Sequence, residues 1–408
     1  MFTIDDLKDK ARQAVDKKAT FGEDINLDQF DRAFVPHKYL AEDEICAIPE
    51  DEQKRLLMSG LDVTDQGRGG TYFQKDTTVI HCHSDEEGIQ VMPVTEALKK
   101  HAWVKDYFWK LVPVDQDKYT ASAFFELHDG YVIRALPGSK SVYPIQACLY
   151  LDKENLQQNV HNLIVVEEGA ELHIITGCAT SPNMKKGIHV GISEFFIKKN
   201  AKLSFTMIHN WAEEMDVRPR SVAMVEEGGL FMNNYICMKP VKSIQMYPTT
   251  YLSGNNATAM FYSIIVGSPG SKFDIGGRTY LKHRGCRSEI IQRAISNGGH
   301  IINRGHLIGD APDIKAHLEC KGLLLKGGII DSIPQLEAHV EGVDMSHEAA
   351  VGKVAQEEIY YLMSRGLSED QATSTIVRGF LNVDIKGLPP NLRTEIDRVI
   401  EASDRDSM

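Results

Sequence analysis

A cysteine, a histidine and a glutamate in the last quarter of the sequence have side chains that could bind a metal. Cys320 stands in an apolar segment, and His347 follows it after 27 residues with Glu348 beside it. Thiolate, imidazole and carboxylate groups are ligands for iron, and thiolates also hold iron–sulfur clusters. The three residues could therefore ligate iron or a nascent iron–sulfur cluster if the fold brings them together.

The same three residues also have a purely structural interpretation. A free cysteine in an apolar strand behaves as a small hydrophobic side chain. His347 could cap a helix, and Glu348 would then be favoured by the helix dipole near the N-terminus of that helix. Spacing alone leaves both interpretations open.

His81-Cys82-His83 is a second candidate for metal binding. Residues two apart in a strand share a face, so the two imidazoles would lie together. Two histidines do not make a site without further ligands, and an ordinary surface strand is the simpler interpretation. The sequence has no Walker A loop, no GxGxxG after a strand, no HExxH and no GxSxG, so the usual motifs of nucleotide, dinucleotide, zinc-protease and hydrolase chemistry are missing.

Composition narrows the class of protein further. The 408 residues include 45 Lys and Arg against 57 Asp and Glu, a net charge of −12, which argues against binding to a nucleic-acid backbone. The seven cysteines are scattered and contain no CxxC pair, so neither a disulfide framework nor a zinc knuckle is indicated. Reduced thiols, the lack of an apolar stretch of membrane-spanning length and the lack of a signal peptide predict a cytoplasmic protein.

The pattern of expected helices and strands divides the chain into three parts, residues 1–129, 130–345 and 346–408. The first part is mixed and mainly helical, with helices expected over 3–19, from about 50 to 59 and over 95–109, and strands over 77–81 and 121–125. The last part is a helical domain with helices over 354–365, from Ser368 onward with Gln371 completing a capping box, and over 392–400.

The middle part, residues 130–345, is predicted to be a stack of short strands. Apolar stretches of four to seven residues alternate with polar turns, and 22 of the 32 glycines fall here. Glycine and asparagine turns recur at about 28 residues, with half-steps near 14, which favours a parallel β-solenoid over a β-sandwich. Cys320 and His347 are about one repeat apart, so they could lie on neighbouring coils, roughly 5 Å apart.

The carboxyl-terminal sequence resembles a known family. The stretch Ser346-His347-Glu348-Ala349-Ala350-Val351-Gly352-Lys353, with 357–369 and 376–380 after it, resembles the signature of the SufB/SufD family, scaffold components of the SUF iron–sulfur cluster assembly system. Shorter stretches that support the resemblance are Asn210-Trp211, Arg304-Gly305 and Glu319-Cys320.

The resemblance implies a fold and a partner. Family members have a right-handed parallel β-helix between amino- and carboxyl-terminal helical parts, and the carboxyl-terminal part docks the SufC ATPase. In this chain the docking part would be about 354–402. Its contact residues would be Tyr360, Tyr361, Ile376 and Phe380, although the same side chains could serve packing within the chain.

The resemblance also assigns site residues. Cys320 falls where the SufB branch has its cluster-assembly cysteine, and His347-Glu348 falls where it has a His-Glu pair. The SufD branch keeps the histidine, replaces the glutamate with glycine and lacks the thiol, so this chain resembles a compact, archaeal-type SufB. It lacks the amino-terminal cysteine cluster of bacterial SufB, and no cysteine lies between Cys178 and Cys237, where a sulfur-receiving thiol is expected. Cys178, Cys237 and Cys286 remain candidates for a sulfur relay.

The expected function is a non-enzymatic scaffold that assembles and transfers a transient iron–sulfur cluster with a SufC-type ATPase. One chain offers one well-placed cysteine, so a homodimer, or a heterodimer with a family paralogue, would double the ligand set. A flavin could supply electrons, although no residue pattern indicates one. The alternatives are a SufD-like structural partner that holds no metal, and a β-helix carbohydrate-active enzyme.

Overall fold

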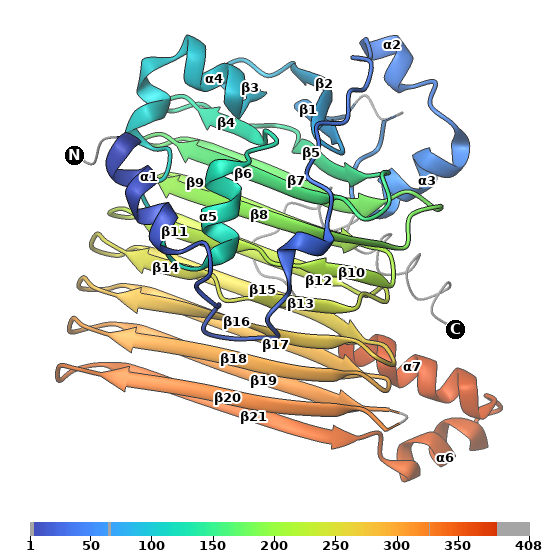
Figure 1. The fold of residues 1–408 in the computed structure, drawn as a ribbon. Helices are drawn as coiled ribbons and strands as arrows, with labels where there is room; N and C mark the ends of the chain where they lie inside the picture. Colours follow the sequence, from blue (N-terminus) through green and yellow to red (C-terminus); the bar gives the residue numbers. More distant parts are fainter. Residues whose placement is uncertain (1–3, 64–66, 326, 382–408) are drawn as a thin grey trace.

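A parallel β-solenoid dominates the computed structural model, which describes residues 4–63, 67–325 and 327–381 (Figure 1). Two sheets face each other across its interior. Sheet 1 runs in the order β2 (Thr78–Ser84), β1 (Gly70–Lys75), β5 (Ile145–Leu151), β7 (Glu171–Thr180), β9 (Lys202–Asn210), β12 (Leu230–Cys237), β15 (Thr258–Gly267), β17 (Arg287–Ser296), β19 (Lys315–Leu324) and β21 (Asp344–Lys353).

Sheet 2 forms the opposite wall of the solenoid. From the carboxyl-terminal end it contains β20 (Ile329–Ala338), β18 (His300–Gly309), β16 (Lys272–Leu281), β13 (Ser243–Met246), β14 (Thr249–Leu252), β10 (Glu214–Val217), β11 (Arg220–Val225), β8 (Lys186–Ile197), β6 (Gln157–Val166), β4 (Tyr131–Ala135) and β3 (Ile89–Pro93). Only β2 against β1 and β3 against β4 are antiparallel, at the amino-terminal end.

The strand register confirms the predicted repeat. Thr258 pairs with Arg287, Arg287 with Lys315, and Lys315 with Asp344, which are steps of 29, 28 and 29 residues. Because side chains alternate across each strand, every second residue points into the lumen and meets its partners in the coils above and below. The lumen is filled mainly by apolar residues, such as Ile290, Leu318 and Leu307.

The predicted turns close each coil with one residue in the left-handed region. This region has φ between about 56° and 93° here and is accessible mainly to glycine and asparagine. The residues are Gly169, Asn200, Gly228, Asn256, Gly270, Gly298 and Gly327. The recurrence of glycine and asparagine in the sequence is therefore a requirement of the coil geometry.

The amino-terminal part covers one end and one flank of the solenoid. It contains α1 (Ile4–Gln13), η1 (Leu27–Gln29), α2 (Glu42–Ile45), α3 (Glu50–Met58), α4 (Val94–Lys100), η2 (Ala102–Asp106) and α5 (Lys118–Phe125). The strand predicted over 121–125 is wrong, because this segment lies in α5. The Asp117 side chain accepts hydrogen bonds from Tyr119 N and Thr120 N and so starts a helix.

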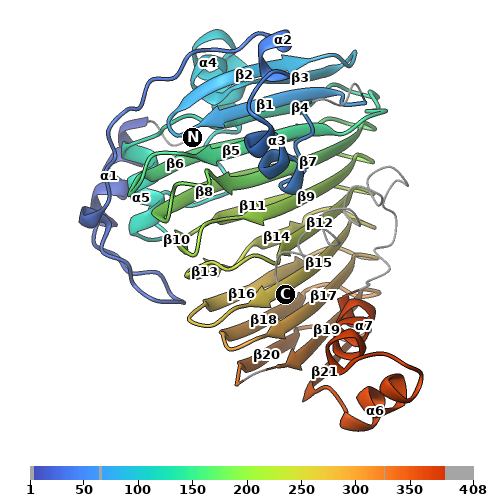
Figure 2. The same cartoon turned by 90° about the vertical axis from the view of Figure 1, so that its right-hand side faces the viewer.

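Residues 35–40 run beside β2 and cover that edge of sheet 1. Leu40 N donates to Ile80 O at 2.6 Å, and Val35 N donates to Thr77 Oγ1 at 2.7 Å. Further along the flank, Phe21 packs edge-on against Tyr247 and lies 4.1 Å from the Arg304 guanidinium. The amino-terminal segment therefore fastens to the outside of sheet 2 as well (Figure 2).

A buried glutamate fastens the loop after η2 to sheet 2. Glu194 lies on β8 and is 0% exposed. Its carboxylate accepts hydrogen bonds from Trp109 N (2.7 Å), Leu111 N (2.5 Å) and Val112 N (3.0 Å), and it lies 2.8 Å from His161 Nε2. One side chain thus satisfies three backbone donors that would otherwise be buried without partners.

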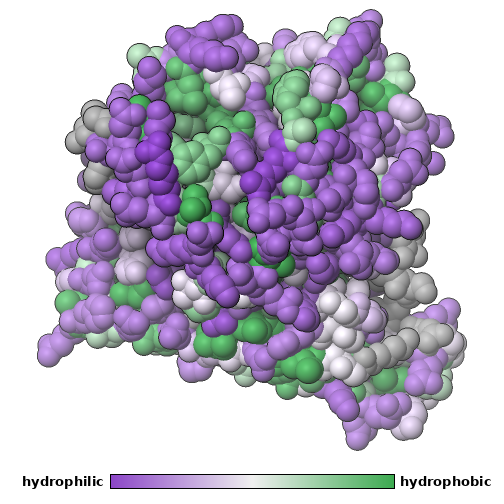
Figure 3. All heavy atoms as spheres, in the orientation of Figure 1, coloured by the Kyte–Doolittle hydropathy of each residue, from purple (hydrophilic) through white to green (hydrophobic). Residues whose placement is uncertain are grey.

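The carboxyl-terminal end of the solenoid is open in the described part of the chain. β21 pairs only with β19, and β20 pairs only with β18. Apolar side chains are exposed there, with Ile329 54%, Val351 42% and Ile333 37% exposed. Hydrophobic atoms accordingly gather along the lower edge of the molecule in Figure 3.

Two helices follow the last strand. β21 continues to Lys353, beyond the predicted boundary at residue 345, and α6 (Gln356–Ser364) and α7 (Glu369–Leu381) come after it. The predicted capping box is confirmed, since Gln371 N donates to Ser368 Oγ at 3.2 Å and Ser368 N donates to Gln371 Oε1 at 2.9 Å. The helix predicted over 392–400 lies outside the described residues. No described helix is long and apolar enough to cross a membrane.

Candidate functional site

Cys320 points into the lumen, one coil inside the open end. It lies on β19, is 1% exposed and belongs to the main hydrophobic core. Its Sγ donates a hydrogen bond to Gln292 Oε1 at 3.0 Å. Burial raises the pKa of the thiol, and the nearby Ser332 hydroxyl offsets only part of that effect. The resting thiol is therefore protonated and protected.

His347 and Glu348 lie in the middle of β21, so the alternative interpretation, in which His347 caps a helix, is wrong. Cys320 pairs in register with Ala349, and Leu318 pairs with His347. His347 is thus two residues from the partner of Cys320 and shares its inward face, whereas Glu348 points to the outer face. The structure brings Cys320 and His347 to one face of adjacent strands and separates Glu348 from both.

Glu348 takes part in a charged network on the outside of sheet 1. Its Oε1 lies 3.5 Å from Lys321 Nζ, and Lys321 Nζ also lies 3.0 Å from Glu319 Oε1. Burial acts to raise the pKa of Glu319, but the hydrogen bond from Lys321 and the charge of Arg293 outweigh it and lower the pKa. Glu348 is 58% exposed at its side chain, so this ion pair is weak.

Sequence reasoning missed three polar residues that surround Cys320. Gln292 is its register partner on β17, and Asn303 and Ser332 are register partners of each other on β18 and β20, across the lumen. We call Gln292, Asn303, Cys320 and Ser332 the lumen quartet. The sequence did carry a signal for them: in two consecutive repeats, a polar residue stands at an inward position of a strand whose other inward residues are mainly apolar.

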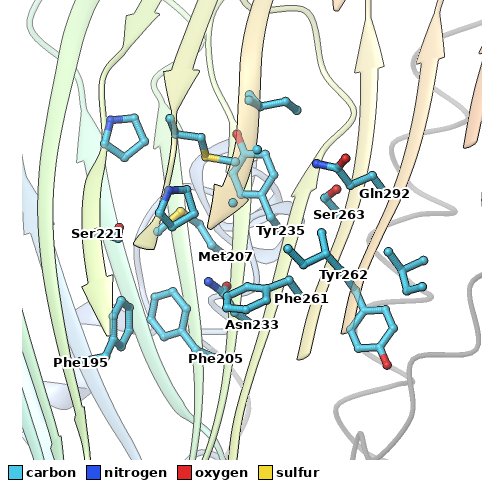
Figure 4. Close-up of a pocket in the computed structure, with 18 residues that line it drawn as sticks. Phe195, Phe205, Met207, Ser221, Asn233, Tyr235, Phe261, Tyr262, Ser263 and Gln292 are labelled. Carbon is cyan, nitrogen blue, oxygen red and sulfur yellow. The ribbon is translucent and has the colours of Figure 1, made fainter. Parts of the chain in front are cut away.

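A small cavity of about 70 Å³ lies in the lumen next to the quartet. Aromatic side chains, among them Phe205, Phe261 and Tyr235, line part of it, and Ser263 and Gln292 lie side by side at one edge (Figure 4). Gln292 therefore faces the cavity on one side and the Cys320 thiol on the other.

Two candidate relay cysteines lie deeper in the lumen, on either side of a histidine. Cys178 and Cys237 are both register partners of His209, which lies on the strand between them. All three are 3% exposed or less. Burial raises the pKa of Cys178 and raises that of Cys237 to about 12. Cys286 lies apart at a turn, where its Sγ donates to Gly254 O at 3.3 Å.

A buried histidine near Cys178, His209 and Cys237 is expected to make the stability of the fold sensitive to acid. Burial lowers the pKa of His189 to about 3, against about 6.5 for an unfolded histidine. Between these values the unfolded chain binds more protons, so stability is lost as pH falls below about 6.5. We expect the free energy of unfolding to fall by up to about 1.4 kcal/mol per pH unit for this residue, measured by urea unfolding between about pH 6 and pH 4.

The matched variants for this pH dependence are His189→Gln and His283→Gln. The first removes a buried imidazole, so its stability should depend less steeply on pH than that of the parent chain. His283 is exposed, and its replacement should leave the slope unchanged. Equal slopes in all three chains would contradict the assignment.

The His81-Cys82-His83 segment lies on β2 and does not form a metal centre. His81 is 3% exposed, with its Nε2 3.0 Å from Glu42, whereas the His83 Nε2 lies 2.7 Å from Asp85 on the surface. Across residues 4–63, 67–325 and 327–381, no three His, Cys, Asp or Glu side chains are grouped closely enough to hold a metal ion.

The expected docking residues divide into two groups. Tyr360 and Tyr361 are 61% and 59% exposed on α6, and Ile376 lines a shallow groove with Tyr361. Phe380 instead packs with Val377 against the outer face of sheet 1. The first group is free to contact a partner, and Phe380 serves to hold α7 in place.

Comparisons with known proteins match most of the chain. A family model described as "SUF system FeS cluster assembly, SufBD core domain" matches residues 149–380. An iron-sulfur cluster assembly SufBD family protein of Archaeoglobus fulgidus is 53% identical over 356 residues, 87% of this chain and 96% of that protein. One from Methanothermobacter thermautotrophicus is 46% identical over 97% of both chains, and one from Pyrococcus horikoshii is 31% identical over 89% of this chain and 85% of that protein.

Proposed function

The chain belongs to the SufBD family of iron–sulfur cluster assembly proteins, and we propose that it is a scaffold on which a cluster is built and from which it is handed on. The observation that carries this proposal is the shared inward face of Cys320 and His347, directly inside the open end of the solenoid. A soft thiolate and an imidazole on adjacent strands suit iron. The cluster is cargo in this proposal and not a resident cofactor.

Two chains are needed to complete the ligand set. A cluster commonly takes four protein ligands, and one open end supplies one thiol and one imidazole. We infer that two open ends meet about a twofold axis, so that β21 of each chain lies beside its copy and each site contributes two ligands. The exposed apolar side chains of the last coil and the unpaired edge of β21 support this pairing.

The partner in this proposal is a SufC-type ATPase that binds the carboxyl-terminal helices. Tyr360 and Tyr361 offer two large exposed aromatic side chains, a residue type that is enriched at protein interfaces. Glu357 and Glu358 border the same groove as Tyr361 and would favour a basic partner surface. ATP hydrolysis by the partner would drive the change in shape that opens or closes the site, and this chain would contribute no catalytic step.

Anaerobic reconstitution with ferrous iron and sulfide tests the scaffold and its pairing together. Visible absorption and native mass spectrometry should find one cluster for every two chains, with the monomer almost free of cluster. A chain that binds no cluster under these conditions would contradict the proposal and favour a structural, SufD-like role.

A variant that weakens pairing sharpens the experiment. Asp344 N donates to Ile314 O of the adjacent coil, so with alternation the N–H of Val351 points to the free edge. Val351→Pro removes that free donor without removing a hydrogen bond inside the solenoid, and Val351→Thr is the matched control. We expect the proline variant to lose both dimer and cluster; a monomeric variant with a full complement of cluster would contradict the pairing.

A further inference from the structure

The outer face of sheet 2 carries a row of positive and aromatic side chains. Side chains alternate along a strand, and Leu281 belongs to the core, so Arg278 and Tyr280 of β16 point outward, as does Lys282 directly after the strand. On the neighbouring strand β14, Tyr251 is the register partner of Tyr280. We define the outer patch as Tyr247, Tyr251, Arg278, Tyr280 and Lys282.

The two cations of the outer patch have no ion-pair partner within the described residues. The Nε of Arg278 is buried and has no hydrogen-bond partner there, and Lys282 is exposed. Two carboxylates of the same face are engaged by β18, since Asp274 bonds its arginine and Glu337 lies 2.8 Å from its histidine. The outer patch is therefore a local excess of positive charge on a chain that is acidic as a whole.

The aromatic rings of the outer patch are in contact with each other and with the cations. The Tyr251 and Tyr280 rings stack with their centroids 5.0 Å apart, and Lys282 Nζ lies 4.8 Å from the centroid of Tyr251 and 5.5 Å from that of Tyr280. Burial raises the pKa of Tyr247 and of Tyr251, so both phenols stay neutral at physiological pH. The charge of the outer patch therefore comes from its two cations.

The amino-terminal segment shows how a peptide binds beside the outer patch. It crosses the outside of sheet 2 as far as β16 (Figure 1), where Glu23 Oε1 lies 2.5 Å from Lys272 Nζ. Phe21 packs edge-on against Tyr247, with ring centroids 5.2 Å apart. An acidic and an aromatic residue of one short segment thus bind to this face, while Lys282 stays exposed.

The geometry of the outer patch favours carboxylates over nucleic-acid bases. Stacking of bases needs free aromatic ring faces, whereas Tyr251 and Tyr280 stack on each other and Lys282 lies over both rings. The net charge of −12 also repels a long polyanion. A short acidic segment needs only the outer patch, where two cations are available to pair with it.

We propose that the outer patch binds an extended acidic segment of a partner protein, with two carboxylates four residues apart and an aromatic side chain between them. Arg278 and Lys282 are four residues apart on one face, a span of about 13 Å, which an extended peptide reproduces. The residue midway between the carboxylates would face Tyr280. Glu357 and Glu358 give the groove at α6 the opposite charge, so the outer patch suits a different partner surface.

Fluorescence anisotropy with a labelled peptide tests the proposal on the full chain. The probe is fluorescein-labelled Gly-Glu-Ser-Phe-Ser-Glu-Gly, and the same peptide with glutamine at both glutamates is its control. The Arg278→Gln, Lys282→Gln double variant should bind the acidic probe about tenfold more weakly than the parent chain, and salt should weaken binding to the parent chain. Lys282→Gln alone should give an intermediate affinity, and it covers the case in which the double variant does not fold.

A neighbouring cation provides the matched control. Arg284 is exposed and already paired with Asp313, so Arg284→Gln should leave the affinity unchanged. Charge reversal adds a gain of function, because the Arg278→Glu, Lys282→Glu variant should bind a probe with lysine at both glutamates. Equal affinity of the parent chain and the glutamine double variant for the acidic probe, or equal binding of the acidic and glutamine probes, would overturn the proposal.

A labelled oligodeoxythymidine separates a peptide site from a nucleic-acid site. The parent chain should bind it more weakly than the acidic probe. Tighter binding of the oligonucleotide, lost in the double variant, would make the outer patch a nucleic-acid site and the proposal wrong. None of these measurements involves iron or sulfide, so the scaffold proposal stands or falls separately by reconstitution.

Discussion

Replacing Cys320 with alanine is expected to lower the amount of cluster bound per chain at least about tenfold. The thiol is the one cysteine that the described part of the chain places beneath the open end, so no other thiolate on that face can substitute for it. Anaerobic reconstitution measured by visible absorption, with iron and sulfide determined per chain, provides the test. Folding should be little changed, because alanine fits the same apolar space.

Graded effects at the neighbouring positions make this prediction specific. His347→Ala should weaken cluster binding less than the cysteine variant does, because it removes one weaker ligand. Glu348→Ala should have little effect on binding within one chain, since Glu348 faces Lys321 on the outer surface. Cys286→Ala is the control, because Cys286 lies at a turn away from Cys320, and it should leave cluster binding unchanged. A Cys320→Ala chain that binds a normal amount of cluster would remove the site assignment.

Replacing Glu194 with alanine is expected to destabilise the fold by about 3–5 kcal/mol. The substitution leaves three buried backbone N–H groups and His161 without their common acceptor. It also detaches the loop after η2 from sheet 2. Urea unfolding followed by circular dichroism should show a lower midpoint with an unchanged slope.

A conservative variant at Glu194 and a control variant at a surface glutamate make this prediction specific. Glu194→Gln keeps an acceptor oxygen and the side-chain volume, so its effect should be smaller than that of alanine. Glu168 is exposed at a turn, and Glu168→Ala should change stability by no more than about 0.5 kcal/mol. An alanine variant at 194 as stable as the one at 168 would mean that water replaces the carboxylate without penalty.

Much of the solenoid could be predicted because its physical constraint repeats. Each coil needs an inward apolar face and a left-handed residue at its turn, so glycine or asparagine returns about every 28 residues. The capping box at Ser368 was equally readable, because it is a local hydrogen-bond pattern. The segment 121–125 was misjudged because its apolar stretch resembles a strand, while the decisive cap lies upstream at Asp117.

The placement of His347 beside Cys320 could be predicted, but that of Glu348 could not, because the register between the two strands differs by one residue from the average repeat. A repeat of 28 from Cys320 leads to Glu348, but the actual step between β19 and β21 is 29 and leads to Ala349. A shift of one residue reverses the face of a strand, so His347 stays with Cys320 and Glu348 does not. The lumen quartet was missed for a related reason. Which residues face each other across the lumen depends on how each coil divides between strands and turns, and the repeat length alone does not give that division.

The two ends of the solenoid differ, and the difference limits how large an assembly it can build. Residues 35–40 occupy the edge beside β2, whereas β21 offers an unpaired edge. A stack with two adhesive ends would polymerise into fibres, as each added molecule would present a fresh end. Because residues 35–40 cover the edge beside β2, the proposed pairing through β21 would leave no second free edge of sheet 1, within the described residues, to which a third molecule could add.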